Sequence, residues 1–175
     1  SSANGVIMDS AVITGTGALS ITGRATGTSS GHGIALLGTT IQDRNAPITL
    51  TGSTAGDGSG VVIRQSGGTS SAIANSGSLT ITSGGGGVSI ESLSTLPPVK
   101  LAANGITIGS TTTNADDVGI SNADIQSTGG DLVVNAVSGG VAISDSTLKN
   151  TGAGNLKVSA PVSSVAVSSS TFSTT

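Results

Sequence analysis

The sequence contains no cysteine, no tryptophan and no tyrosine, and only one phenylalanine. Without cysteine the chain has no disulfide framework and no thiolate metal ligands. With a single aromatic residue, a compact core would lack most of its largest apolar contributors. Charged residues make up only 9% of the chain, against about 25% in an ordinary globular domain. The polar surface must therefore come from Ser, Thr, Asn and Gly, a composition typical of many short strands and tight turns.

The charge balance and the length of the apolar runs limit the partners of the chain. The chain contains six basic and nine acidic residues, which gives a net charge of −3. No basic cluster is present to bind nucleic acid or an anionic membrane surface. No apolar run approaches the roughly 18 residues of a membrane span. Residues 1–5 contain no initiator Met and no signal-peptide pattern, so we expect the chain to be an excised segment of a longer protein.

Short apolar runs with alternating periodicity recur along the whole chain and fall into three classes. The first class begins with glycine, the second lies between members of the first, and a weaker third follows the first. The first class contains residues 5–8, 33–36, 60–63, 87–90, 105–108 and 140–143, with a further candidate at 119–120. The second contains residues 19–21, 48–50, 79–81, 99–101, 132–134 and 156–158. The third includes residues 11–13, 39–41, 124–125 and 147–148.

This internal repeat of variable length predicts a solenoid. One unit cannot bury its few apolar side chains alone, whereas stacked units build a continuous core. We therefore predict an all-β fold, a right-handed parallel β-helix of about seven coils, forming one unit over residues 1–175. In this fold Val61, Val88 and Ile106 should lie one above another. Corners are expected at residues 23–32, 52–59 and 84–87. Pro97-Pro98 should force a bulge or a corner in the shortest unit, because proline cannot donate to a central ladder.

Several phrases carry a family resemblance: Gly17-Ala-Leu-Ser-Ile-Thr-Gly23, Ala46-Pro-Ile-Thr-Leu-Thr-Gly52, Gly77-Ser-Leu-Thr-Ile-Thr-Ser83, Gly129-Gly-Asp-Leu-Val-Val134 and Gly152-Ala-Gly-Asn-Leu-Lys-Val158. They resemble the shaft of filamentous haemagglutinin-like exoproteins, adhesins exported by the two-partner route, and of related autotransporter passengers. The resemblance covers nearly the whole chain. It implies a secreted or cell-surface location, an outer-membrane export partner, and a role in adhesion, aggregation or biofilm. The Asn-Pro-Asn motifs of the family's secretion domain do not occur here.

The residues that could carry chemistry do not form a recognisable catalytic set. His32 is the only histidine, and we interpret it as a solvent-facing corner residue, since no strand-to-helix nucleophile elbow accompanies it. Asp117, Asp124 and Asp131 are seven residues apart and would approach each other if their corners stack. A glycosidase needs paired carboxylates, usually with aromatic residues that stack on the sugar, and the chain has no Trp or Tyr for this purpose. We therefore predict no enzyme and assign no catalytic residue.

Two further patterns suggest binding rather than catalysis. Residues 56–60 and 129–131 echo parts of a calcium-binding nonapeptide, but they do not recur at nine-residue spacing. An adventitious ion beside Asp116-Asp117 is the one exception that we leave open, and we assign no metal and no cofactor. Thr-x-Thr patterns at 49–51, 80–82 and 111–113 raise ice binding. Ser20 and then Lys100, Val133 and Lys157 at the matching positions interrupt that array, and the outward face of a strand also favours threonine.

These observations favour a structural shaft segment of a large secreted or cell-surface bacterial adhesin. The Ser/Thr surface could contact host or bacterial glycans or matrix polysaccharide, or neighbouring rods through self-association. The alternative is a carbohydrate-active β-helix, either a lyase or glycosidase or a glycan binder, with ice binding as a third hypothesis.

Overall fold

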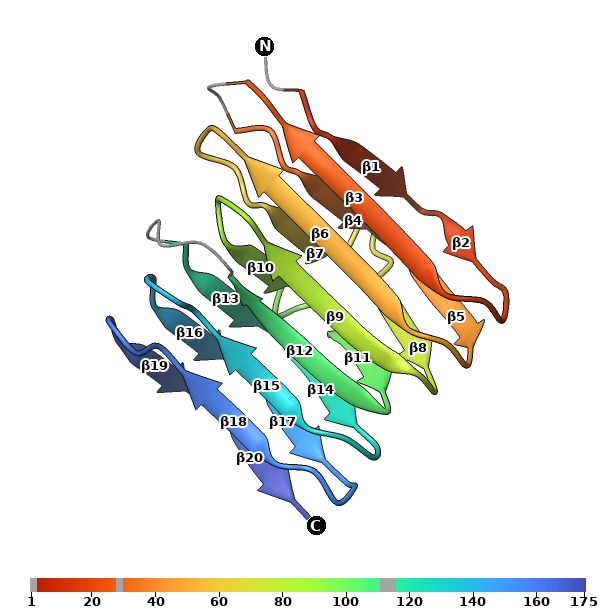
Figure 1. Ribbon diagram of the computed structural model, residues 1–175, viewed down its shortest axis with the longest axis vertical. Helices are drawn as coiled ribbons and strands as arrows, with labels where there is room; N and C mark the ends of the chain where they lie inside the picture. The colour runs from red at the N-terminus through yellow and green to blue at the C-terminus, as the bar shows by residue number, and fades with distance from the viewer. Residues whose placement is uncertain (1–2, 28–29, 111–115) are drawn as a thin grey trace.

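The computed structural model describes residues 3–27, 30–110 and 116–175, which form twenty β-strands and no helix (Figure 1). The strands belong to three parallel sheets. Sheet A contains β1 (Val6–Asp9), β4 (Ile34–Leu37), β7 (Val61–Arg64), β10 (Val88–Glu91), β13 (Val118–Ser121), β16 (Val141–Ser144) and β19 (Val165–Ser168). Sheet B contains β2 (Val12–Ile13), β5 (Thr40–Arg44), β8 (Ala72–Asn75), β11 (Val99–Ala103), β14 (Ala123–Ser127), β17 (Thr147–Asn150) and β20 (Thr171–Thr174). Sheet C contains β3 (Leu19–Ala25), β6 (Ile48–Thr54), β9 (Ser78–Ser83), β12 (Gly105–Ser110), β15 (Leu132–Asn135) and β18 (Leu156–Ser159).

The chain visits the three sheets in the order A, B, C and then advances by one layer, which we call a coil. Six complete coils are followed by β19 and β20 of a seventh within the described residues. The strands of sheet C run across the front of the molecule and those of sheet A behind it, so that the coil winds in the right-handed sense (Figure 1). The predicted right-handed parallel β-helix is confirmed.

Alternation along each strand places one set of side chains inside the solenoid. In β10, for example, Val88 and Ile90 are buried members of the core, whereas Ser89 between them is only partly buried. Register partners are alike, since Val61 pairs with Ile34 on one side and with Val88 on the other. Burial of each such side chain contributes about 1.5–3 kcal/mol. The result is one continuous apolar core that spans the coils.

Two short segments lie in sheets other than those predicted. Ile106 belongs to β12 in sheet C, where it pairs with Leu79 and Leu132, so the predicted position above Val88 is occupied by Val118 instead. Residues 99–101, which the repeat pattern groups with the strands of sheet C, form part of β11 in sheet B. The short repeat unit predicted between the glycine-led runs at 87–90 and 105–108 therefore does not exist. A glycine followed by an alternating apolar triplet fits any corner of the solenoid, so this pattern does not identify the sheet.

The corner between sheets A and B is made by residues with left-handed backbone conformation. Asp145 has a φ of 49°, and the equivalent positions in other coils have φ between 46° and 55°; these are Ser10, Gly38, Asn122 and Ser169. The residue that follows is often a hydroxyl residue that bonds across coils. Thr39 donates from its Oγ1 to the carbonyl of Met8 at 2.9 Å. These side chains satisfy backbone groups that the ladder leaves free at the bend.

The corner from sheet C to sheet A depends on close backbone packing. A Cβ atom on Gly52 would lie 1.9 Å from the carbonyl oxygen of Gly60, which only glycine permits. Strand β6 extends to Thr54, so the bend begins later than the predicted residue 52. The predicted corner at residues 84–87 is confirmed, and Gly85, Gly86 and Gly87 all have positive φ there. Pro97-Pro98 also lies in a corner, directly before β11.

Candidate functional site

Two corner loops between sheets A and B are much longer than the others. Most connections at this corner contain one or two residues, whereas residues 65–71 and 92–98 form longer loops on consecutive coils. Gly67 and Gly68 have φ of 55° and 84°, which allows a tight reversal in which Ser66 and Thr69 exchange two backbone hydrogen bonds of 2.9 Å. The second loop cannot continue the ladder at Pro97-Pro98. The two long loops therefore project next to each other from the corner between sheets A and B.

The two loops contact each other and are anchored to the coil. The hydroxyl of Ser70 in the first loop bonds to the carbonyl oxygen of Pro97 in the second. The hydroxyl of Ser92 donates to the same carbonyl at 2.9 Å. In the next coil, Asn122 donates from its Nδ2 to the carbonyl of Leu93 at 2.7 Å. The loops are therefore fixed relative to sheet A.

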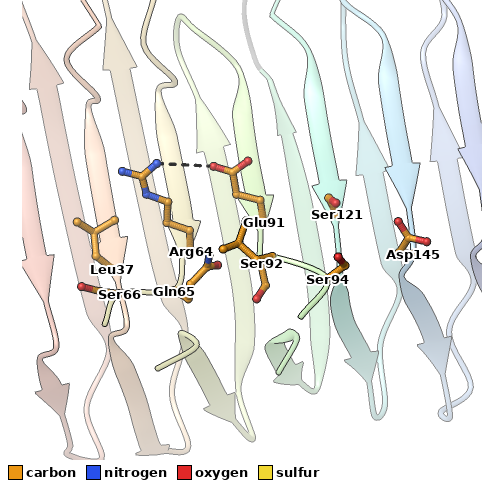
Figure 2. A pocket seen from close by; sticks show the side chains of 10 residues that line it. Leu37, Arg64, Gln65, Ser66, Glu91, Ser92, Ser94, Ser121 and Asp145 are labelled. Carbon is orange, nitrogen blue, oxygen red and sulfur yellow. Dashed lines mark ion pairs between the residues drawn. The ribbon is translucent and has the colours of Figure 1, made fainter. Parts of the chain in front are cut away.

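Beside these loops lies an open groove with a volume of about 610 Å³ (Figure 2). Its floor is a row of outward-facing register partners, one from each of four successive strands of sheet A: Leu37, Arg64, Glu91 and Ser121. The loops supply the side chains of Gln65, Ser66, Ser92, Leu93 and Ser94, and the corner after β16 supplies Asp145. The groove therefore crosses several neighbouring strands of sheet A and is lined mostly by hydroxyl, carboxamide and charged groups.

The groove contains one ion pair, between Arg64 and Glu91, and a second acidic residue, Asp145. Arg64 Nη1 lies 3.8 Å from Glu91 Oε1, and the two side chains are 44% and 47% exposed. An ion pair with this exposure contributes about 0–1 kcal/mol to stability. Both groups remain accessible to a ligand, and Asp145 lies further along the same side of the groove (Figure 2).

Gln65 carries an unusual polar atom. Its Oε1 is buried and has no hydrogen-bond partner, and it is the one such side-chain atom among the residues that the structure describes. Leaving a buried acceptor unpaired costs about 1–3 kcal/mol. Gln65 is one of the residues that line the groove, but this oxygen itself has almost no contact with solvent.

His32 lies at a corner, as predicted, but it is half-buried rather than solvent-facing. Its Nδ1 accepts a hydrogen bond from the backbone N–H of Ser59 at 3.0 Å, and its own backbone N–H donates to Asn4 Oδ1 at 2.6 Å. Burial lowers the pKa of His32, and the positive charge of Arg64 lowers it further. The prediction of a solvent-facing histidine was wrong because the ring is the acceptor for the next coil. Its contacts join three coils.

The three spaced aspartates lie on different sides of the solenoid. Asp117 precedes β13 in sheet A and accepts from the backbone N–H of Gly140 at 2.7 Å. Asp131 precedes β15 in sheet C and accepts from the backbone N–H of Asn155 at 2.7 Å. Asp124 is in β14 of sheet B, where its register partners are Lys100 and Thr147. The stacking that would bring these carboxylates together does not occur.

The two aspartates of the candidate ion site, Asp116 and Asp117, each accept a hydrogen bond from a backbone N–H group of a neighbouring coil. Asp116 is buried, and its Oδ1 accepts from the backbone N–H of Gly86 at 2.8 Å. Its neighbour Asp117 is exposed and bonds to a different coil. In the described ranges no three His, Cys, Asp or Glu side chains are close enough to hold a metal ion together.

The threonine array on sheet C is more regular than the sequence indicated. Thr107, not Lys100, follows Thr49 and Thr80 in the outward column, because Lys100 belongs to sheet B. Val133 and Lys157 do continue this column, as predicted. In the second column Thr51 and Thr82 lie with their Oγ1 atoms 3.3 Å apart. The predicted pattern at 111–113 lies outside the described residues.

Sequence reasoning did not find the groove. In the sequence Arg64 is one of several isolated cations, although in the structure it pairs with Glu91 in the adjacent coil. The available signal was the position of Gly67-Gly68 and Pro97-Pro98, each of which follows a glycine-led strand and lengthens the same corner. Recognising it requires the strand classes to be assigned correctly first.

No protein-family model, no curated protein and no solved structure matches this chain. Within the part of the chain that the structure covers, no helix has the length and apolar character needed to cross a membrane.

Proposed function

We propose that this chain is a shaft segment of a large secreted or cell-surface bacterial adhesin. The observation that carries the proposal is the continuous stacking of coils, with three parallel ladders and one uninterrupted apolar core. A solenoid of this kind is rigid along its axis because each coil contacts its neighbours through all three sheets. Such a rod holds a distal binding region away from the cell surface.

The distribution of hydrogen bonds supports a mechanical role. Backbone hydrogen bonds between coils run along the rod axis, so tension along the axis acts on all three ladders together. Side chains reinforce the corners between coils; Asp131 bonds to Asn155 and Asp117 to Gly140. A coil detaches only when its ladder bonds, its corner bonds and its share of the core are lost together. Low charge and many hydroxyl groups leave the outer surface hydrated.

The cellular context of the proposal rests on sequence resemblance. Residues 17–23, 46–52 and 77–83 resemble filamentous haemagglutinin-like shafts, and this resemblance supports export through an outer-membrane partner to the cell surface. Host or bacterial glycans, matrix polysaccharide and neighbouring rods are the partners proposed for such a shaft. Adhesion, aggregation and biofilm formation are the corresponding roles.

Single-molecule pulling tests this proposal. The full chain is placed between two folded reference domains and stretched from its ends. We expect resistance followed by stepwise extension, with each step releasing about one coil, on the order of 80–100 Å of chain. Smooth extension of the chain at low force, without steps, would contradict a shaft function.

A further inference from the structure

The outward face of sheet C carries two columns of hydroxyl side chains that run along the rod axis. The first column contains Ser20, Thr49, Thr80 and Thr107, and the second contains Thr22, Thr51 and Thr82. In the first four coils these residues fill both columns except for one position, which is Gly109. The sequence spacing placed Lys100 within this array, but Lys100 belongs to sheet B. The array is therefore uncharged and nearly complete over four coils.

The array is regular because sheet C has long strands and an unbroken register in these coils. Strands β3 and β6 have seven residues each, and β9 and β12 have six each. Their pairs run without a register shift, whereas the ladder between β5 and β8 in sheet B shifts between Ile41 and Arg44. Neighbouring hydroxyl residues therefore repeat at about 4.8 Å along the rod and at about 6.6 Å along each strand, twice the rise per residue.

The threonines of the array are held in place and face water. Branching at Cβ restricts their side-chain rotamers, and Thr49 and Thr80 are half-buried between their neighbours. Within the coils that the structure describes, the hydroxyls of Thr49, Thr80 and Thr107 make no hydrogen bond to the protein. The face lies open across the front of the molecule in Figure 1, and the two long loops leave from the opposite corner, between sheets A and B. Water is the partner of these hydroxyls.

A rigid grid of hydroxyl groups can distinguish ice from liquid water, which a single hydroxyl cannot. The grid orders the water molecules above it at its own repeat, and because the fold already fixes the side chains, little further ordering is needed on binding. Hexagonal ice has similar repeats on its prism faces, one slightly shorter than the coil spacing and one slightly longer than the two-residue repeat of a strand. Water ordered by this face therefore fits the surface of an ice crystal.

The other outward faces of the solenoid do not offer such a grid. Sheet A presents the ion pair of Arg64 with Glu91, and sheet B presents Lys100 beside Asp124. Charged groups such as the lysine ammonium bind their own hydration shells strongly, and these shells do not follow a lattice. In sheet C the first column continues as Val133 and Lys157 in the fifth and sixth coils. The suitable surface is thus limited to the first four coils.

We propose that the outward face of sheet C in the first four coils binds ice through water that its two hydroxyl columns order. This activity is separate from the mechanical role and does not depend on it. A shaft with such a face attaches to ice crystals along its side.

Partitioning of the full chain into ice tests the proposal. Ice is grown slowly from a dilute protein solution, and the protein in the ice and in the remaining liquid is measured by peptide-bond absorbance, since the chain has no Trp or Tyr. The shape of single ice crystals grown in the solution is the second readout. Thr80→Lys is the test variant, and Lys157 in the same column shows that the fold accommodates lysine there.

Thr147→Lys is the matched control. Thr147 is also half-buried and lies on sheet B, in an outward column that already contains Lys100. The two variants add the same charge and the same side chain, but only Thr80→Lys interrupts the hydroxyl grid. Thermal unfolding of both variants verifies that each is folded.

A variant that extends the array tests the proposal in the opposite direction. Val133→Thr combined with Lys157→Thr places hydroxyl groups in the first column of the fifth and sixth coils. A longer grid contacts more of the ice surface, so this double variant should enter ice to a greater extent than the wild-type chain. It should also shape ice crystals at a lower protein concentration. This result does not depend on the folding of Thr80→Lys.

We expect the wild-type chain and Thr147→Lys to be enriched in the ice and to produce faceted crystals, whereas Thr80→Lys should remain in the liquid. Exclusion of the wild-type chain from ice would overturn the proposal. Equal enrichment of Thr80→Lys, loss of enrichment in Thr147→Lys, or no gain in the double variant would also overturn it. The stepwise extension expected under force is unaffected by these outcomes, so failure of the ice-binding face and failure of the shaft function can be distinguished.

Discussion

The imidazole Nδ1 of His32 accepts a hydrogen bond from the backbone N–H of Ser59, 3.0 Å away in the next coil. Only the neutral imidazole can accept at this atom, because protonation makes both ring nitrogens donors. Burial and the nearby Arg64 lower the pKa of the folded-state ring below its usual value near 6.5. The unfolded chain therefore takes up a proton before the folded chain does.

This linkage predicts a specific pH dependence of stability. Well above pH 6.5 the ring is neutral in both states and the hydrogen bond contributes fully. As the pH falls below about 6.5, the unfolded state binds more protons, so the free energy of unfolding decreases until the folded-state ring also titrates. Urea unfolding at pH 7.5 and at pH 5.0 measures this change, and His32→Gln should show a smaller change over the same interval. An equal change in the variant would assign the effect to other groups.

Gly52 is predicted to be intolerant of any side chain. An added Cβ would lie 1.9 Å from the carbonyl oxygen of Gly60 and 2.6 Å from its carbonyl carbon, so two backbone segments would have to separate. Gly52→Ala should lower the free energy of unfolding by about 1–3 kcal/mol. Gly119→Ala is the matched control in a strand of sheet A, because nothing lies within 4 Å of a Cβ atom added there. Denaturant unfolding of both variants checks the prediction, and a larger loss in Gly119→Ala would contradict it.

The hydroxyl of Ser146 is predicted to stabilise the corner between sheets A and B. Ser146 is buried, and its Oγ donates to the carbonyl of Ser144 at 2.6 Å and accepts from the backbone N–H of Ala123 at 3.1 Å. Ser146→Ala leaves both backbone groups without this partner and should cost about 1–3 kcal/mol. Ser20→Ala on the exposed face of sheet C should change stability by less than about 0.5 kcal/mol. Thermal unfolding of the two variants gives the comparison, and similar midpoints would argue against this role for the hydroxyl.

The sequence allowed the β-helix to be predicted, because its repeat is carried by inward apolar residues that any coil must supply. Val61 and Val88 pair as expected. The assignment of strands to sheets was less secure where loop lengths change. Residues 65–71 and 92–98 lengthen one corner, and the resulting shift makes Ile106 resemble a residue of sheet A and residues 99–101 a strand of sheet C. A short apolar triplet does not indicate which corner precedes it, and so it does not identify the sheet to which it belongs.

The groove could not be predicted for a related reason. Arg64 and Glu91 are far apart in sequence and meet only because β7 and β10 are register partners. The unpaired state of Gln65 Oε1 depends on the folded loop and has no counterpart in composition or spacing. The left-handed corner residues are more accessible to sequence reasoning: Asp145 and Asn122 are types that tolerate positive φ, and each follows a strand of sheet A.

The stacking of coils in the register described is tested most directly by paired spin labels. The chain has no native cysteine, so two introduced cysteines carry the only labels. Thr80 and Thr107 are neighbours on adjacent strands of sheet C, about 4.8 Å apart, whereas Lys100 belongs to sheet B. Labels at Thr80 and Thr107 should show strong dipolar broadening, and labels at Thr80 and Lys100 should show much less. Strong coupling for Thr80 with Lys100, and weak coupling for Thr80 with Thr107, would contradict the solenoid register on which the account depends.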